Sequence, residues 1–314
     1  MPDFAAAVAR REPILTDGGI ETHVMFDTDF EMDPDVQVAA MVGDERGEPI
    51  LREIYADYVK AGKDHGLPVV IGTPTFRASE NFTRRAGLEE GAVERLNKGA
   101  AAMHREIREA SGWEETYIAG VLGPSGDAYT PGEAASAQAA AEYHRRQADA
   151  LADAGVDFLF AATFPAVEEA LGACEAMGAT ELPYVISFVL DRDGNVLDGT
   201  LLGAAIALID LQTDPKPLIH SISCVHPSVG AKAVEAVRAD APGVYERLGE
   251  LKANGSPLST DELVKLDHVE SDAPDVFAAE MAALLDADGL HVLGGCCGTT
   301  DAHMQALARR LADA

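Results

Sequence analysis

Three of the four cysteines occupy positions from which their thiols can act together. Cys224 follows an apolar run, while Cys296 and Cys297 are adjacent and flanked by glycines. Three thiolates around one point suit a zinc ion, which is tetrahedral and keeps its fourth position open in catalytic sites. The flanking glycines permit the sharp turn that directs two neighbouring thiols at one ion. These residues predict a three-cysteine zinc site with room for one more ligand.

Two other roles for the cysteines stay open at this point. A single cysteine at a strand end, such as Cys224, is commonly a small buried hydrophobic residue. The adjacent pair Cys296 and Cys297 is also compatible with a redox switch, although a switch gives the third thiol no role. Cys174 lies within a helical stretch beside Ala173 and Glu175, and we expect it to contribute to packing.

Bringing the three thiols together requires strands that end on the same side of the fold. Short β-rich apolar runs alternate with stretches of helical spacing, as in Val93, Leu96, Ala100, Met103 and Ile107. The same helical spacing occurs in Ile54, Tyr55, Tyr58 and Val59, and in Met304, Leu307 and Leu311. The predicted strands are Ile14–Asp17, Pro68–Thr73, Tyr117–Leu122, Val156–Ala161, Tyr184–Leu190, Leu218–Ser223, an indistinct one near Val244–Lys252, and His291–Gly294.

Eight strands, each followed by a helical stretch, predict an α/β protein with a single (β/α)8 TIM barrel over residues 1–314. A doubly wound sheet is the alternative, but Gly18-Gly19 is followed by Ile20-Glu21-Thr22 rather than by the glycine pattern of a dinucleotide site. In a barrel, the carboxyl ends of the sixth and eighth strands lie on one rim, where active sites form. Residues 254–275 are the expected long loop or insertion.

Composition and net charge limit the kinds of partner that the protein is expected to bind. The chain has 314 residues, with 53 Asp and Glu against 24 Lys and Arg, giving a formal net charge of −29. An acidic surface of this kind repels phosphate backbones and anionic lipids, so we expect no nucleic-acid or membrane partner. No signal peptide or apolar run long enough to span a membrane is recognisable, which favours a cytoplasmic protein with reduced thiols. The oligomeric state is open.

The end motif GGCCGT, the upstream strand-end cysteine, the opening ILTDGGIET and the segment TPTFRAS resemble the homocysteine S-methyltransferase family over almost the whole chain. The resemblance implies a (β/α)8 barrel in which Cys224, Cys296 and Cys297 hold Zn²⁺. It also implies transfer of a methyl group from a sulfonium or ammonium donor to a homocysteine-like thiol, and a part in methionine biosynthesis. The implied partners are therefore a small-molecule thiol acceptor and a methyl donor.

The same resemblance implies the substrate-contacting residues. Asp17, with Gly18 and Gly19, corresponds to a carboxylate at the family's substrate site and is the expected catalytic and substrate-binding residue. Thr75 and Thr163 are the other substrate-binding candidates. Asp17 is equally compatible with a turn beside Gly18, and Thr75 with structural capping.

Two departures from the family pattern affect the acceptor pocket. After the fourth predicted strand, Ala162 occupies the place of a glutamate that recognises the homocysteine amino group. Ser221-Ile222-Ser223 replaces the usual Gly-Val-Asn or Gly-Ile-Asn. A changed acceptor, or a zinc-binding barrel without methyl transfer, is therefore the alternative function.

Four other polar residues lie near the predicted rim and could contact a substrate or a metal ion. Glu21 and His23 are candidates to replace the missing glutamate carboxylate. We expect His220 and His226 to be structural rather than metal ligands, because three cysteines supply the protein's share of a catalytic zinc site.

Overall fold

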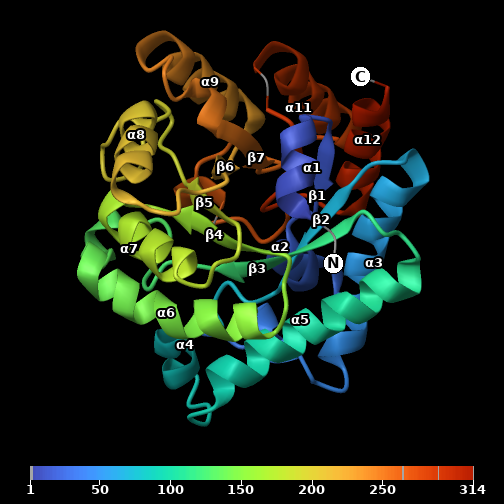
Figure 1. Cartoon of the computed structure of the whole chain (residues 1–314). Helices are drawn as coiled ribbons and strands as arrows, with labels where there is room; N and C mark the ends of the chain where they lie inside the picture. Colours follow the sequence, from blue (N-terminus) through green and yellow to red (C-terminus); the bar gives the residue numbers. More distant parts are fainter. Residues whose placement is uncertain (1–2, 264, 289, 314) are drawn as a thin grey trace.

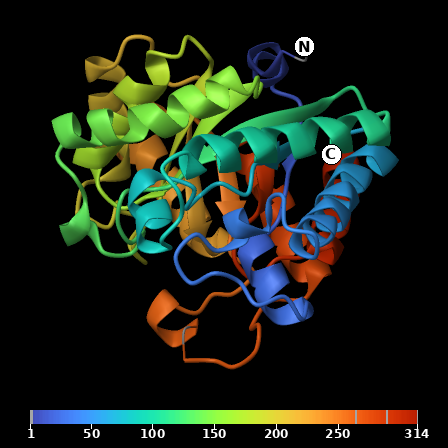
Figure 2. The ribbon, with the colours of Figure 1, turned by 90° about the horizontal axis from the view of Figure 1, so that it is seen from below.

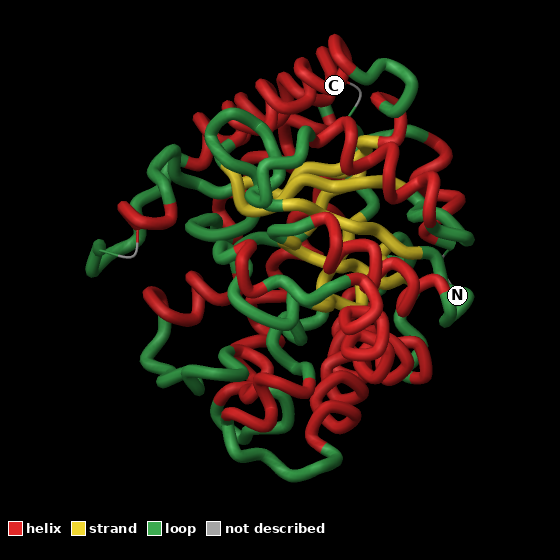
Figure 3. Tube along the Cα trace, turned by 90° about the vertical axis from the view of Figure 1, so that its left-hand side faces the viewer, coloured by secondary structure: helices red, strands yellow, loops and turns green. Residues whose placement is uncertain are grey.

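The strands form a closed parallel barrel. The computed structural model describes residues 3–263, 265–288 and 290–313. Each strand pairs with its sequence neighbours, and β8 closes on β1. Figure 3 shows the strands at the centre of the molecule with helices around them. The strands are β1 (Ile14–Thr16), β2 (Val69–Gly72), β3 (Thr116–Leu122), β4 (Phe158–Phe164), β5 (Tyr184–Phe188), β6 (Ile219–Val225), β7 (Leu248–Ala253) and β8 (Val292–Gly295).

A ring of helices covers the outside of the barrel (Figure 1). None of the helices in the described ranges is both long and apolar enough to cross a membrane. The helices are α1 (Phe4–Arg10), α2 (Ile20–Asp27), α3 (Gly47–His65), α4 (Glu80–Arg85), α5 (Ala92–Ser111), α6 (Ala137–Asp153), α7 (Val167–Gly178), α8 (Leu202–Gln212), α9 (Pro227–Asp240), α10 (Thr260–Leu263), α11 (Pro274–Asp288) and α12 (Asp301–Ala312).

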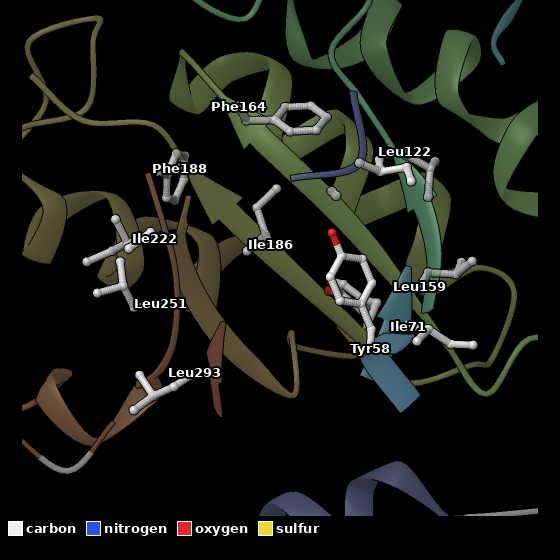
Figure 4. Close-up of a cluster of buried hydrophobic side chains, with 14 of the residues drawn as sticks. Tyr58, Ile71, Leu122, Leu159, Phe164, Ile186, Phe188, Ile222, Leu251 and Leu293 are labelled. Atoms are coloured by element: carbon white, nitrogen blue, oxygen red, sulfur yellow. The ribbon is translucent and has the colours of Figure 1, made fainter. Parts of the chain in front are cut away.

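Strand alternation divides the apolar residues between two cores. On β4, Phe158, Phe160 and Ala162 face the barrel interior, whereas Leu159 and Ala161 pack against the helices. This follows from the two-residue period of a strand. Figure 4 shows the outer core, with labelled side chains that include Ile186, Ile222 and Leu293. The near-continuous apolar character of the strands is therefore explained by burial on both faces.

The amino-terminal helix α1 closes one end of the barrel interior. The Phe4 ring stacks on Phe158 with a centroid distance of 3.8 Å and an interplanar angle of 9°. It also contacts Tyr117, at 5.5 Å. In Figure 1, α1 lies inside the ring of outer helices. A ligand therefore enters from the opposite end, where the strands have their carboxyl termini.

Residues 254–275, expected to be a loop or insertion, form a long segment at that opposite end. Its described part contains only α10 before α11 begins at Pro274. Figure 2 shows the orange segment with α10 projecting on the side away from the N-terminus. The start of this segment, directly after β7, borders the cysteine loop.

The predicted barrel is confirmed, and every predicted strand overlaps an observed one. The predicted strand ends differ from the observed ones in most strands, and the differences are largest in β4 and β7. Strand β4 continues to Phe164 through a register shift after Ala161, which the apolar pattern did not reveal. Strand β7 begins only at Leu248, because Tyr245–Arg247 forms a 3-10 turn ahead of it.

Candidate active site

The structure brings the three expected cysteines together. Cys224 lies near the end of β6, and Cys296 and Cys297 directly follow β8. Their sulfur atoms all lie within 4.8 Å of one another, and the Sγ atoms of Cys224 and Cys297 are 4.0 Å apart. Cys174 is buried in α7, as expected of a packing residue. The three clustered thiols form a group that can hold a metal ion.

The end of β7 supports both parts of this cluster. The Cys296 backbone N–H donates to the Ala253 carbonyl at 2.7 Å, and the Gly255 N–H donates to the Cys297 carbonyl at 2.9 Å. The Asn254 side-chain amide donates to the Cys224 carbonyl at 3.0 Å. One short segment therefore positions cysteines from two different strands, and sequence reasoning did not identify Asn254.

The turn after β1 supports the cysteine loop from the other side. The Gly19 N–H donates to the Thr299 carbonyl at 3.2 Å and to its hydroxyl at 3.1 Å. The Gly298 N–H donates to the Thr22 hydroxyl at 3.0 Å. A Cβ atom at Gly19 would lie 2.3 Å from the Cys296 carbonyl oxygen, so this close approach requires glycine.

Two residues beside the cluster have left-handed backbone conformations that side chains rarely adopt. Cys224 has φ 56° and Thr163 has φ 62°. The Thr163 hydroxyl lies 3.9 Å from the Cys224 sulfur. Such conformations cost energy and persist where the surrounding structure enforces them, frequently at functional sites. Thr163, predicted to contact substrate, thus lies directly against the cluster.

The donor set fits a cation. Hydrogen bonds from Cys296 and Cys297 lower the pKa of Cys224, whereas interaction with Cys224 raises the pKa values of Cys296 and Cys297. Three thiolates at this separation repel one another, because each negative charge disfavours ionisation of its neighbours. A divalent cation at the centre would remove that repulsion, and thiolates are suited to soft or borderline metals.

A cavity of about 310 Å³ extends from the cysteines into the barrel mouth. One wall is polar and is formed by Asp17, which directly follows β1, and by Glu250 and Lys252 of β7. The opposite wall is apolar, and its residues come from β2, β3 and β4: Val70, Ala119, Val121, Phe158, Phe160 and Ala162. Ala162, at the place of the family's glutamate, therefore belongs to the apolar wall and supplies no charge.

Asp17 already has partners within the protein. Its Oδ2 accepts a hydrogen bond from the Gly72 N–H at 2.6 Å, and its Oδ1 is paired with the Lys252 ammonium. Burial alone would lower the pKa of Lys252, but attraction by Asp17 and Glu250 outweighs it and raises that pKa. Lys252 was missed by sequence reasoning. The available signal was a charged residue, two positions after Glu250, in the predicted seventh strand.

Gly18, Gly19 and Thr163 line the cavity with Asp17, but the structure places Thr75 elsewhere. Thr75 is fully buried, and its hydroxyl donates to the Val121 carbonyl at 2.7 Å. Among the described residues it is Thr73, two positions earlier, that lines the cavity. The contacts of Thr75 are those of a structural residue, which was the alternative to a role in substrate binding.

Of the two residues suggested as replacements for the missing glutamate, Glu21 faces the cavity. Burial raises the pKa of its carboxyl group, and the nearby charges of Cys224 and Asp17 act in the same direction. His23 instead lies 3.9 Å from Asp27 in the same helix. Of these two residues, Glu21 is therefore the one that a ligand in the cavity would meet.

The two histidines near β6 have structural partners. His220 is buried and pairs with Asp210 at 2.9 Å. The His226 ring caps α9 by accepting from the Ser228 N–H, and its other nitrogen lies 3.0 Å from Asp272. Neither belongs to the cysteine group among the described residues.

Comparisons with known proteins agree with this geometry. A family model described as Homocysteine S-methyltransferase matches residues 14–311. Homocysteine S-methyltransferase of Escherichia coli (strain K12) is 26% identical over 279 residues, covering 83% of this chain and 84% of that protein. Betaine–homocysteine S-methyltransferase 1 of Mus musculus is 24% identical over 284 residues, but this chain covers only 64% of its length.

A solved structure supports the fold. The metallated form of the Escherichia coli homocysteine methyltransferase MmuM matches with a TM-score of 0.76 and 23% identity. The match covers 97% of this chain and 98% of that one. The barrel described above is therefore shared with that protein over nearly its whole length.

Proposed function

Because the chain belongs to the homocysteine S-methyltransferase family, we propose that it is a zinc-dependent thiol S-methyltransferase. The observation that carries the proposal is the convergence of Cys224, Cys296 and Cys297 at a cavity in the mouth of the barrel. These three residues would hold the zinc ion. When bound, the ion lowers the pKa of an acceptor thiol, so that the sulfur is available as a thiolate near neutral pH.

The reaction we propose is a direct displacement at a methyl carbon. The acceptor thiol loses its proton, its sulfur forms a bond to the methyl carbon, and the bond from that carbon to a sulfonium or ammonium centre breaks. The donor leaves as a neutral thioether or tertiary amine. The cavity suits a cationic donor because the aromatic rings of Phe160 and Tyr129 line it.

The residues of the chain would position the two substrates. The backbone at Gly18 and Gly19 brings the turn after β1 against the cysteine loop, and Asp17 lies at the base of that turn. We assign Asp17, Gly18, Gly19 and Thr163 to the substrate surface. The apolar wall with Phe158 excludes water from the reacting groups.

The experiment that tests this proposal combines metal analysis with methyl transfer. Purified protein should contain about one zinc per chain, and mass spectrometry should detect methionine formed from homocysteine with S-methylmethionine or betaine. Cys296→Ser should lose both metal and transfer, while Cys174→Ala, a matched change in a buried cysteine outside the cluster, should keep both. Full transfer by a metal-free Cys296→Ser protein would refute the proposal.

One observation favours a second candidate function. Ala162 leaves the acceptor side of the cavity apolar, which suits a thiol without an amino group at that point. The same barrel would then methylate another thiol or bind one without transfer. A panel of thiols tested with each donor separates these cases, because only the alternative predicts that homocysteine is a poor acceptor.

A further inference from the structure

Arg77 is a cation that lines the cavity and forms no salt bridge with the described residues. It lies in the loop after β2, is partly buried and lines the cavity. Its Nε is buried with no hydrogen-bond partner, and within the described ranges its guanidinium makes no ion pair. The guanidinium lies over the Phe82 ring, with its Cζ 5.0 Å from the ring centroid. Buried polar groups are normally satisfied. Several buried polar atoms of the described residues lack a partner, and among them the Arg77 Nε is the one whose residue lines the cavity, where a ligand could satisfy it.

Glu21 is the complementary anion. It lies in the first turn of α2, lines the same cavity and, in the described part of the chain, forms no ion pair. Glu21 and Arg77 interact electrostatically but are too far apart to form a salt bridge with each other. Two opposite charges that face one cavity without meeting leave space between them for a ligand that carries both charges.

The other charges of the cavity do not compete for this role. Asp17 is neutralised by Lys252, and Ala162 carries no charge. Glu250 lies on the same strand as Lys252 and is buried. Asp127 also lines the cavity and attracts Arg77, but it is exposed and its Oδ1 accepts hydrogen bonds from the Tyr129 N–H and the Thr130 hydroxyl. Glu21 and Arg77 are therefore the opposite charges of the cavity that remain to recognise a zwitterion.

The order of the groups along the cavity matches an amino-acid thiol. Glu21 follows Gly19 by two residues, and Gly19 packs against the Cys296 carbonyl and bonds to Thr299, so Glu21 lies beside the cysteine loop. Arg77 lies in the loop after β2, with its guanidinium over the Phe82 ring of α4. A thiol acceptor held at the cysteines by its sulfur would place its ammonium group beside Glu21 and its carboxylate at Arg77.

We propose that Glu21 and Arg77 are specificity-determining residues that bind the α-ammonium and α-carboxylate groups of an amino-acid thiol acceptor. Arginine suits the second task because its planar guanidinium can hold a carboxylate through two parallel hydrogen bonds. This inference rests on the proposed function, since it assumes that a thiol occupies the cysteine site. It also explains how homocysteine is recognised in a barrel that has Ala162 in place of a glutamate.

The test measures binding of three thiols to the zinc-loaded protein by calorimetry, without a methyl donor. The thiols are L-homocysteine, 3-aminopropane-1-thiol, which lacks the carboxylate, and 4-mercaptobutanoate, which lacks the ammonium group. Arg77→Gln should weaken binding of homocysteine and 4-mercaptobutanoate by about tenfold and leave 3-aminopropane-1-thiol unchanged. Glu21→Gln should weaken homocysteine and 3-aminopropane-1-thiol by about tenfold and leave 4-mercaptobutanoate unchanged.

Arg85→Gln is the matched control. Arg85 also lies over the Phe82 ring, at 4.6 Å, but it is paired with Asp35, so its loss should not change any of the three affinities. Zinc content and circular dichroism verify that each variant is folded. Equal changes for all three thiols, no change for any of them, or a native protein that does not prefer homocysteine over both analogues would each overturn the inference.

The outcomes also separate this inference from the proposed function. If the two variants discriminate among the thiols as expected but the native protein transfers no methyl group, the recognition pair stands and the catalytic proposal fails. If the native protein methylates homocysteine and the variants bind all three thiols as the native protein does, the catalytic proposal stands and the recognition pair fails.

Discussion

At the scale of single residues, the ion pair between Asp17 and Lys252 determines what the polar wall of the cavity offers a ligand. The side chains are only 7% and 15% exposed, respectively. Both oxygens of Asp17 have protein partners, so its carboxylate is held in place rather than free to follow a ligand. A carboxylate accepts up to about four hydrogen bonds, which leaves Asp17 able to contact a substrate from this fixed position.

Removing one partner of the Asp17–Lys252 ion pair should destabilise the folded protein. Lys252→Met leaves the Asp17 charge buried without its counter-ion, so we expect the free energy of unfolding to fall by about 3–5 kcal/mol. Urea denaturation measures the change. Asp17→Asn combined with Lys252→Met should recover most of the loss, and Lys98→Met, which breaks an exposed pair with Asp153, should cost less than about 1 kcal/mol. An equally large loss in both single lysine variants would contradict this account.

Glu250 should make stability depend on pH. Burial raises its pKa from 4.5 to about 7, so between these values the folded chain keeps a proton that the unfolded chain has lost. Stability from this group is therefore full at low pH and declines as pH rises through that interval. Glu250→Gln should be stabilised relative to the native chain, with a gain about 1–2 kcal/mol larger at about pH 8 than at about pH 5.5.

Thermal unfolding at the two pH values tests the Glu250 prediction. Glu235→Gln, which changes an exposed carboxylate on α9, is the control and should show no such pH-dependent gain. A gain for Glu250→Gln that is the same at both pH values would show that its carboxyl group titrates normally.

At the scale of elements, the metal site depends on three segments that meet rather than on the cysteines alone. The turn between β1 and α2, the end of β7 and the loop after β8 exchange backbone hydrogen bonds around the thiols. Supporting contacts of this kind orient ligands and influence metal affinity. The loop after β8 leads into α12, whose first turn is capped by Thr300 and His303.

Gly19→Ala should disturb this meeting point. The added Cβ would lie 2.3 Å from the Cys296 carbonyl, so the cysteine loop must shift. We expect zinc affinity to fall by about tenfold or more, measured by competition with a chromogenic chelator. Gly132→Ala has nothing within 4 Å of its added Cβ and should bind zinc as the native chain does. Unchanged affinity in Gly19→Ala would show that the loop adjusts without moving the thiols.

At the scale of the whole molecule, excess negative charge acts on stability. The formal net charge of −29 produces repulsion among surface carboxylates, which destabilises a compact state. Exposed ion pairs such as Arg95 with Glu89 offset only a small part of it. The barrel must therefore fold against this repulsion through its two apolar cores.

Salt should relieve that repulsion. Raising sodium chloride from about 0.05 M to about 1 M shortens the screening length to roughly 3 Å. We expect the melting temperature of the zinc-loaded protein to rise by a few degrees, as measured by differential scanning calorimetry. Substituting sucrose at the same osmolality separates charge screening from solvent exclusion. A melting temperature that falls with added salt would show that attractive pairs outweigh the repulsion.

Local pattern was sufficient to predict the barrel and the cysteine cluster. The β-rich runs and helical spacing depend on residues close in the chain, and the closing rule for eight parallel strands then placed Cys224 on the same rim as Cys296 and Cys297. Sequence reasoning also noticed Ala162 and Glu21. Glu21 was predictable from its place after the first strand, whereas Ala162 was recognised through the resemblance to the family, which has a glutamate there.

Only the tertiary structure decided how the charges of the cavity are paired. Lys252 reaches Asp17 across 235 residues of sequence, and this contact exists because β8 closes between β1 and β7. The same closure leaves Arg77 and Glu21 facing one space without touching. Side-chain pairing between distant segments depends on strand register and rotamer, which hydrophobic periodicity does not encode, so no reading of the chain alone could have assigned these partners.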